Sequence, residues 1–135
     1  MRKLIFIAFL LLSVIKIQAQ EVKENLAYVG VGGNGLTYYV NTKTIRKDSG
    51  DMIKVWVYGI NEGKNKIDPL IPKNLKTVKI HYEINCKKYS MRIIRYSEYD
   101  DKGINISDTD ASFNEFKEVI PDTIGETILN TVCNN

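Results

Sequence analysis

The chain has 135 residues, of which 19 are Lys or Arg and 16 are Asp or Glu, giving a formal net charge of +3. Three basic residues, Arg2, Lys3 and Lys16, lie in an N-terminal segment that we expect to be removed, and the remainder then carries no net charge. A length typical of one domain and this charge balance exclude bulk electrostatic attraction to nucleic acid, so no nucleic-acid partner is predicted.

The first 19 residues resemble a secretory signal peptide. Two basic residues open the chain, an apolar run follows at residues 4–15, and the small Ala19 comes after several polar residues. This run is shorter than the roughly 20 apolar residues of a spanning helix. We predict cleavage after Ala19, export, and one domain at residues 20–135 without membrane insertion; the alternative is an uncleaved anchor.

Cys86 and Cys133 are the two cysteines of the chain. Exported proteins meet an oxidising compartment, so an even cysteine count predicts a disulfide. Closing a loop of this length stabilises a domain by about 4 kcal/mol. The chain has a single histidine, His81, and its acidic residues lack the spacing of a calcium loop, so no metal and no cofactor is predicted.

The first half of the domain reads as strands joined by turns. Residues 27–31 form a short strand, a glycine-rich turn follows at residues 32–35, and a second strand runs from Thr37 to about Ile45. After a turn at residues 47–51, the segment Met52–Ile60 alternates between apolar and other side chains. Its two faces are Ile53, Val55 and Val57 against Lys54, Trp56 and Tyr58.

The second half continues this pattern. Residues 61–74 are predicted to be a surface loop, and residues 76–84 a strand that points Lys79, His81 and Glu83 outward. A long strand is expected at residues 86–99, with a bulge near Ile94 where the alternation breaks. A turn at residues 100–103 and a strand at residues 104–107 follow, with Asp108 in a solvated acidic loop.

The C-terminal segment is typical of an amphipathic helix. Thr123 and Glu126 have the spacing of a capping box, and apolar residues then recur on one face to about Val132. The predicted fold class is α+β: an antiparallel β-sheet of five to six strands, with this helix packed on one face and one disulfide.

Binding candidates lie on the strand Met52–Ile60 and in the loop after it. Trp56 and Tyr58 are either buried under another element or exposed as a binding surface with Lys54, since exposed aromatic and basic residues anchor protein contacts. The loop lysines belong either to a merely soluble loop or to a site for polyanions. No catalytic residue is predicted, because His81 is expected to face solvent. The loop lysines are Lys64, Lys66, Lys73 and Lys76.

Charge is uneven along the chain. Residues 42–95 carry 13 basic and 5 acidic residues, whereas residues 96–135 carry 2 and 9. The two halves either face each other and neutralise, or form separate basic and acidic faces.

Several segments together resemble the bacterial surface-adhesin protein E family, from about Ala27 to Cys133. The resemblance implies an antiparallel sheet with a packed helix, a Cys86–Cys133 bridge, and binding of host matrix and serum proteins such as laminin, vitronectin and plasminogen. This chain departs from the family pattern at Asp122-Thr123, where Gly-Ser is usual, and it lacks a lipidation cysteine. The segments are residues 38–41, 44–45, 53–57, 86, 89–99, 101–103 and 120–133.

These observations predict an exported, non-enzymatic binding domain for matrix or serum proteins. The alternative is a periplasmic or envelope-associated interaction domain with no adhesive role. Nothing in the sequence predicts an oligomeric state.

Overall fold

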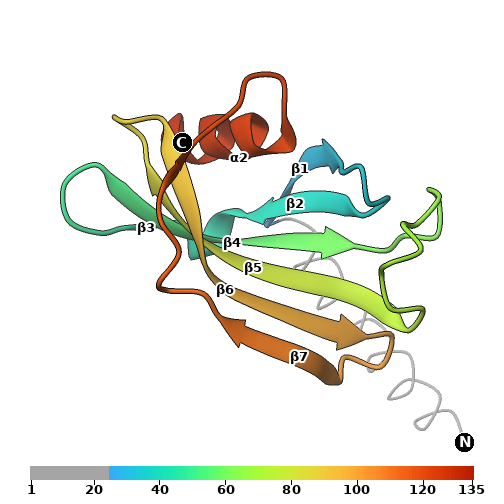
Figure 1. Ribbon diagram of the computed structural model, residues 1–135. Coiled ribbons are helices and arrows are strands. Elements are labelled where there is room, and N and C mark those ends of the chain that lie inside the picture. The colour runs from blue at the N-terminus through green and yellow to red at the C-terminus, as the bar shows by residue number, and fades with distance from the viewer. Residues whose placement is uncertain (1–24) are drawn as a thin grey trace, which may run out of the picture.

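The computed structural model describes residues 25–135, and the expected signal peptide lies outside them. An antiparallel sheet of six main strands, in the order β1-β2-β4-β5-β6-β7, curls beneath the helix α2 (Figure 1). This confirms the predicted fold class. The elements are β1 (Leu26–Val31), β2 (Thr37–Asn41), the 3-10 helix η1 (Thr42–Thr44), β3 (Arg46–Lys47), β4 (Met52–Ile60), β5 (Leu75–Asn85), β6 (Ser90–Asp100), β7 (Asn105–Asp110), β8 (Lys117–Glu118) and α2 (Ile124–Cys133).

The second strand is shorter than predicted. It ends at Asn41, and the chain turns into η1 instead of continuing to Ile45. The hydroxyl of Thr44 donates to the Asn41 carbonyl at 2.7 Å and accepts from the Trp56 amide at 2.9 Å. A local side-chain hydrogen bond therefore replaces the strand ladder at this point.

The predicted strand at residues 86–99 is wrong at its start, because residues 86–89 form the turn between β5 and β6. The Asn85 side chain accepts from the Lys88 amide at 2.9 Å, and Tyr89 adopts a φ of 52°. The bulge is confirmed: His81 pairs with Arg95 and Tyr82 with Ile93, which leaves Ile94 as the extra residue.

The last main strand is longer than predicted. β7 reaches Asp110, so Asp108 lies in a strand and not in an acidic loop. The chain then leaves the sheet at Ala111 and returns at β8, which pairs with the start of β6. Residues 111–116 thus form a connection along the edge of β6.

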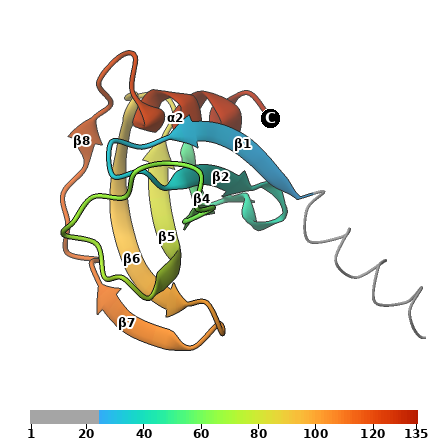
Figure 2. The same cartoon turned by 90° about the vertical axis from the view of Figure 1, so that its right-hand side faces the viewer.

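The main core lies between α2 and the first strands. Figure 2 shows α2 lying over these strands. Buried Ile128, Leu129 and Val132 of the helix pack in one cluster with residues such as Val40 and Val55. The Thr123 side chain accepts from the Glu126 amide, so the predicted N-cap is confirmed. The predicted disulfide is also confirmed: Cys86 and Cys133 are bonded, with their Cα atoms 5.8 Å apart.

The loop at residues 61–74 covers a second, smaller core. Its Ile67 and Ile71 pack on buried Leu36 and neighbours from β5. The Asp68 amide donates to the Asn34 carbonyl at 3.1 Å. Gly35 has a φ of 85°, and a Cβ there would lie 2.2 Å from the Lys66 carbonyl oxygen, so only glycine allows this approach. The loop is therefore anchored to the β1–β2 turn.

Candidate binding face

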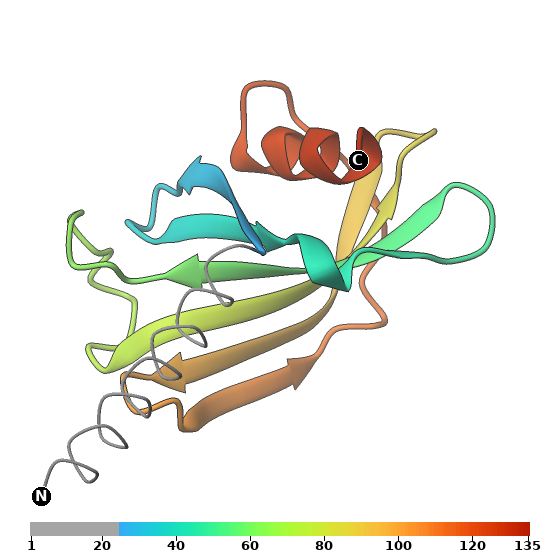
Figure 3. The same cartoon turned by 180° about the vertical axis from the view of Figure 1, so that it is seen from behind.

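The face of the sheet opposite α2 carries three of the sequence-predicted site residues. Strand alternation points Ile53, Val55 and Val57 into the core beneath α2, and Lys54, Trp56 and Tyr58 away from it. Within residues 25–135 no helix covers this side, which we call the open face (Figure 3). Trp56 and Tyr58 are half-buried on this face, which lies between the two alternatives of full burial and full exposure.

A row of tyrosines crosses the open face. Tyr28 pairs with Tyr39, Tyr39 with Tyr58, and Tyr58 with Lys79, on four neighbouring strands. The rings of Tyr28 and Tyr39 meet edge to face with centroids 5.9 Å apart. We call Tyr28, Tyr39 and Tyr58 the tyrosine row. The Lys79 amine ends it, 5.3 Å from the Tyr58 ring and 4.6 Å from the Tyr99 ring.

Polar contacts fix two members of the row. The Tyr39 hydroxyl donates to Glu62, and this hydrogen bond, followed by burial, raises the pKa of Tyr39 to about 12. The same bond lowers the pKa of Glu62, which also pairs with Lys64 at 3.4 Å. The Asn41 amide donates to the Tyr58 hydroxyl at 3.2 Å. Tyr39 and Tyr58 are thus held in place before any partner binds.

Trp56 stacks on His81 beside the tyrosine row. Their ring centroids are 4.4 Å apart and the planes differ by 5°. Burial, then the nearby Lys54, lowers the pKa of His81. His81 therefore points to the open face as predicted, but it is half-buried against Trp56 and not fully exposed. Among residues 25–135, no group of three or more His, Cys, Asp or Glu is placed to hold a metal ion.

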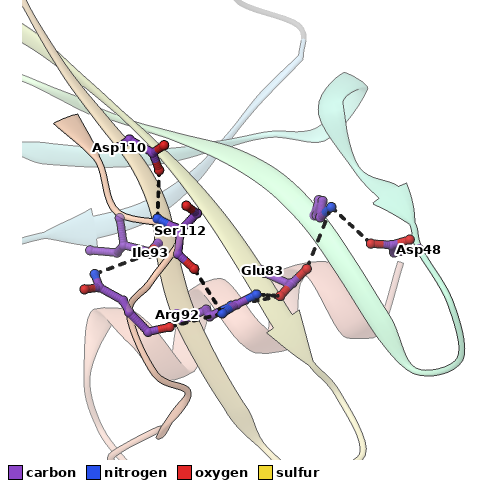
Figure 4. Close-up of polar contacts among 8 residues, drawn as sticks. Asp48, Glu83, Arg92, Ile93, Asp110 and Ser112 are labelled. Carbon is purple, nitrogen blue, oxygen red and sulfur yellow. Dashed lines mark hydrogen bonds and ion pairs between the residues drawn. The ribbon is translucent and has the colours of Figure 1, made fainter. Parts of the chain in front are cut away.

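An ion network lies close to His81. Figure 4 shows its members Asp48, Glu83 and Arg92. Glu83 was expected to point to solvent, but it is only 7% exposed. Arg92 pairs with it at 2.7 Å, and Lys54 lies 3.8 Å from Glu83 and 3.1 Å from Asp48. Lys54 is therefore largely neutralised by its neighbours.

Arg92 also anchors the connection between β7 and β8. Its guanidinium donates to the carbonyls of Ser112 and Asn114, each at 3.2 Å, and lies 4.8 Å from the Phe116 ring centroid. Figure 4 shows this connection lying against the sheet beside Arg92. Glu83 is buried because Arg92 and this connection lie against it.

Arg95 and Asp108 form the ion pair at the far side of the open face. Their side chains meet at 2.5 Å, and Ser97 donates to the same carboxylate at 2.6 Å. The Arg95 hydrogen bond, then that of Ser97, lowers the pKa of Asp108 to about 2. Of the five ion pairs among the described residues, this one alone joins the basic and acidic halves of the chain.

The loop lysines lie at one end of the sheet. Lys64 reaches the tyrosine row through Glu62. Lys73 and Lys76 line a polar cleft of about 350 Å³ that also includes Asp101, and the Lys76 amine donates to the Asn61 carbonyl at 2.6 Å. Lys66 does not line this cleft. The structure therefore brings three of the four lysines toward one region, and their role in binding stays a prediction.

Sequence reasoning missed Tyr28, Tyr39, Lys79 and Tyr99 as site residues. A hairpin closed by the glycine-rich turn gives some signal for the pairing of Tyr28 with Tyr39. The continuation to Tyr58 and Lys79 depends on registers between strands distant in sequence, which local patterns do not encode.

Within residues 25–135, no helix has the length and apolar character needed to cross a membrane.

Solved structures of Haemophilus influenzae protein E share this fold. The selenomethionine form has a TM-score of 0.57 and 19% identity, covering 81% of this chain and 87% of that chain. Crystal form II has a TM-score of 0.55 and 18% identity, covering 80% and 87%. A structure from a non-typeable strain has a TM-score of 0.53 and 16% identity, covering 82% and 76%.

A search of curated proteins finds no significant match. The sequence pattern of the family described as Surface-adhesin protein E, however, matches residues 27–134, most of the chain. The chain therefore belongs to the surface-adhesin protein E family.

Proposed function

We propose that this chain is an exported adhesin-like domain whose open face binds a matrix or serum protein. The observation that carries the proposal is the tyrosine row, in register across neighbouring strands and next to the Trp56–His81 stack. Tyr and Trp are enriched at the energetic centres of protein interfaces. Family membership and the Cys86–Cys133 disulfide, which suits an oxidising compartment, support adhesion and export.

The proposed function is non-enzymatic. His81 is the only histidine, and no hydrogen bond joins it to a hydroxyl or carboxylate within the described part of the chain. A general base needs such a partner or a substrate proton within reach. Its lowered pKa and its indole neighbour suit packing in an aromatic surface better.

The first test is surface binding of the mature protein to laminin, vitronectin and plasminogen. Tyr28→Ala should weaken binding to the recognised protein about 5- to 10-fold, because interface tyrosines commonly contribute more than 1 kcal/mol. Tyr28 is 64% exposed, so the fold should tolerate this change. Ile120→Ala is the control, since Ile120 is 69% exposed and lies just before α2, on the helix side of the sheet. Absence of binding to all three proteins at low salt, or equal losses in both variants, contradicts the proposal.

A second test addresses the loop lysines. Replacing Lys64, Lys66, Lys73 and Lys76 together with Gln should weaken binding and flatten its salt dependence, because peripheral charges mainly steer association. The control replaces four other exposed lysines and so changes the net charge equally. If both quadruple variants behave alike, the loop has no specific role. The control lysines are Lys43, Lys47, Lys87 and Lys88.

Cell fractionation distinguishes adhesion from the alternative of an envelope-associated interaction domain. Surface protease should digest a tagged adhesin on intact cells. Retention in the periplasm, with protection from protease, would favour the alternative.

A further inference from the structure

A cavity of about 640 Å³ lies on the helix side of the sheet, away from the open face. The start of α2, the β1–β2 turn and β5 line it and leave it open to solvent, and its wall residues include Tyr38, Ile80, Tyr82, Asp122, Ile124 and Ile128. Its volume is within the range of small-molecule sites, roughly 300–1,000 Å³. A smaller cavity of about 280 Å³ shares Tyr82 with it. The concave side of the sheet thus has room for a ligand.

The floor of this cavity is apolar and fixed. Ile80 and Ile128 are 5% and 1% exposed. The Tyr38 ring lies against two glycines, since a Cβ at Gly32 or Gly59 would come within 2.7 or 2.8 Å of it. Asn34 donates to the Tyr38 hydroxyl at 2.8 Å. An aromatic wall held in this way costs little ordering entropy when a ligand binds.

Tyr82 contributes a hydroxyl that the protein leaves without a partner. The residue is partly buried, and its hydroxyl makes no hydrogen bond within residues 25–135. Burial raises the pKa of Tyr82 to about 12, so the hydroxyl stays protonated at neutral pH. Among the described residues, the fully buried side-chain atom without a partner is Asn41 Oδ1, so the Tyr82 hydroxyl reaches solvent, and a ligand atom in the cavity can replace water as its partner.

Asp122 provides the single charge of the cavity wall. It forms no ion pair with any described residue, and its φ of 61° is in the left-handed region that an aspartate tolerates only at some cost. Thr123 caps the N-terminus of α2, and the Glu126 carboxylate lies in its first turn. The positive charge at this end of the helix dipole is therefore already partly balanced without Asp122. A carboxylate beside two aromatic rings is complementary to a cation.

We propose that this cavity binds a small organic amine, with its ammonium group at Asp122 and its apolar body against Tyr38 and Tyr82. The site is on the opposite side of the sheet from the proposed adhesive face. The site would therefore bind a second ligand, and this proposal can be tested independently of protein binding at the open face.

The test uses three probes with one skeleton: 2-phenylethylamine, 2-phenylethanol and phenylacetate. Each is titrated into the ¹⁵N-labelled mature protein while the amide signals of Gly32, Gly33 and Gly125 are followed by NMR. The amine should shift these signals saturably and bind about tenfold more tightly than the alcohol, because a charge pair near a protein surface contributes energy of this order. Phenylacetate should be the weakest probe.

Two variants locate the interaction. Asp122→Asn keeps a residue that tolerates positive φ but removes the charge, so the amine should lose its tenfold advantage over the alcohol. Tyr82→Phe should weaken the amine and the alcohol alike, by roughly 3- to 5-fold. Asp101→Asn removes a carboxylate outside the cavity and should change nothing.

The proposal is overturned if the amine and alcohol bind unmodified protein equally, if no probe shifts the three glycines, or if the amine keeps its advantage in Asp122→Asn. Unchanged binding of Asp122→Asn to the matrix or serum protein separates this result from the adhesive function.

Discussion

Glu83 shows how one buried charge shapes the open face. Its carboxylate is 7% exposed on the side of the sheet without a helix, and Arg92 supplies its main counter-charge. The Arg92 guanidinium also donates hydrogen bonds to the Ser112 and Asn114 carbonyls. Removing the arginine would leave a buried carboxylate with only the more distant Lys54, and would release the β7–β8 connection.

Arg92→Ala should therefore lower the free energy of unfolding by roughly 2–4 kcal/mol, since breaking a buried pair leaves an uncompensated charge. Arg95→Ala is the control, because the Arg95–Asp108 pair is exposed and such pairs contribute at most about 1 kcal/mol. Denaturant unfolding of both variants measures the difference. Equal losses would show that burial of Glu83 does not matter energetically.

The Asp108 carboxylate makes the β6–β7 contact sensitive to acid. Its folded-state pKa is lowered to about 2, below the usual aspartate pKa of 3.8, so its contribution to stability is present above about pH 4 and is lost as the pH falls toward 2. An NMR titration of this carboxylate should show the low pKa in the unmodified protein. Arg95→Gln should move it back toward the usual range, and an unchanged value would contradict the assigned cause.

At the scale of elements, the start of α2 depends on Thr123 and on its neighbour Asp122. Thr123 accepts from the Glu126 amide at 3.3 Å and donates to the Ile120 carbonyl at 2.7 Å. Thr123→Ala should cost about 1 kcal/mol in thermal or denaturant unfolding, whereas Thr123→Ser should be close to neutral. A loss in the serine variant as large as in the alanine variant would argue against capping as the cause.

Asp122 occupies a backbone position that favours glycine. A φ of 61° is available to glycine without steric cost. Asp122→Gly should therefore be neutral or stabilising by up to about 1 kcal/mol, measured by the same unfolding transition. Marked destabilisation would show that the Asp122 side chain makes a contact that supports the fold.

Local patterns predicted the regular elements well and the irregular ones poorly. Strict alternation identified β4 and β5, and the cap identified α2. The β5–β6 turn was missed because Tyr89 occupies a positive-φ position where glycine or asparagine would give the usual signal. The end of β2 was missed because the competing bond from Thr44 is made through a side chain.

At the scale of the whole molecule, the disulfide joins the β5–β6 turn to the end of α2 across a separation of 47 residues. Cys86→Ser with Cys133→Ser should destabilise the domain by about 4 kcal/mol, because the unfolded chain regains loop entropy. The melting temperatures of oxidised, reduced and double-mutant protein would measure this loss. A difference between the reduced and the double-mutant protein would indicate a role for the serine side chains.

The open face was only partly predictable, because its residues come from several strands that pair across the sheet. Sequence placed Lys54, Trp56 and Tyr58 on one side of one strand. It could not show that Tyr39 and Lys79 flank Tyr58, or that Glu83 is buried on that side, because these neighbours arise from pairing and from the β7–β8 connection.

Trp56 is the only tryptophan of the chain, and its indole lies face to face with the His81 imidazole. Its emission therefore reports on a single place in the molecule, without any attached dye. A protonated imidazole quenches indole fluorescence, and since the pKa of His81 is lowered, the emission should dim only in acid below the usual histidine range. Contact of a ligand with this part of the surface should change the same optical signal directly.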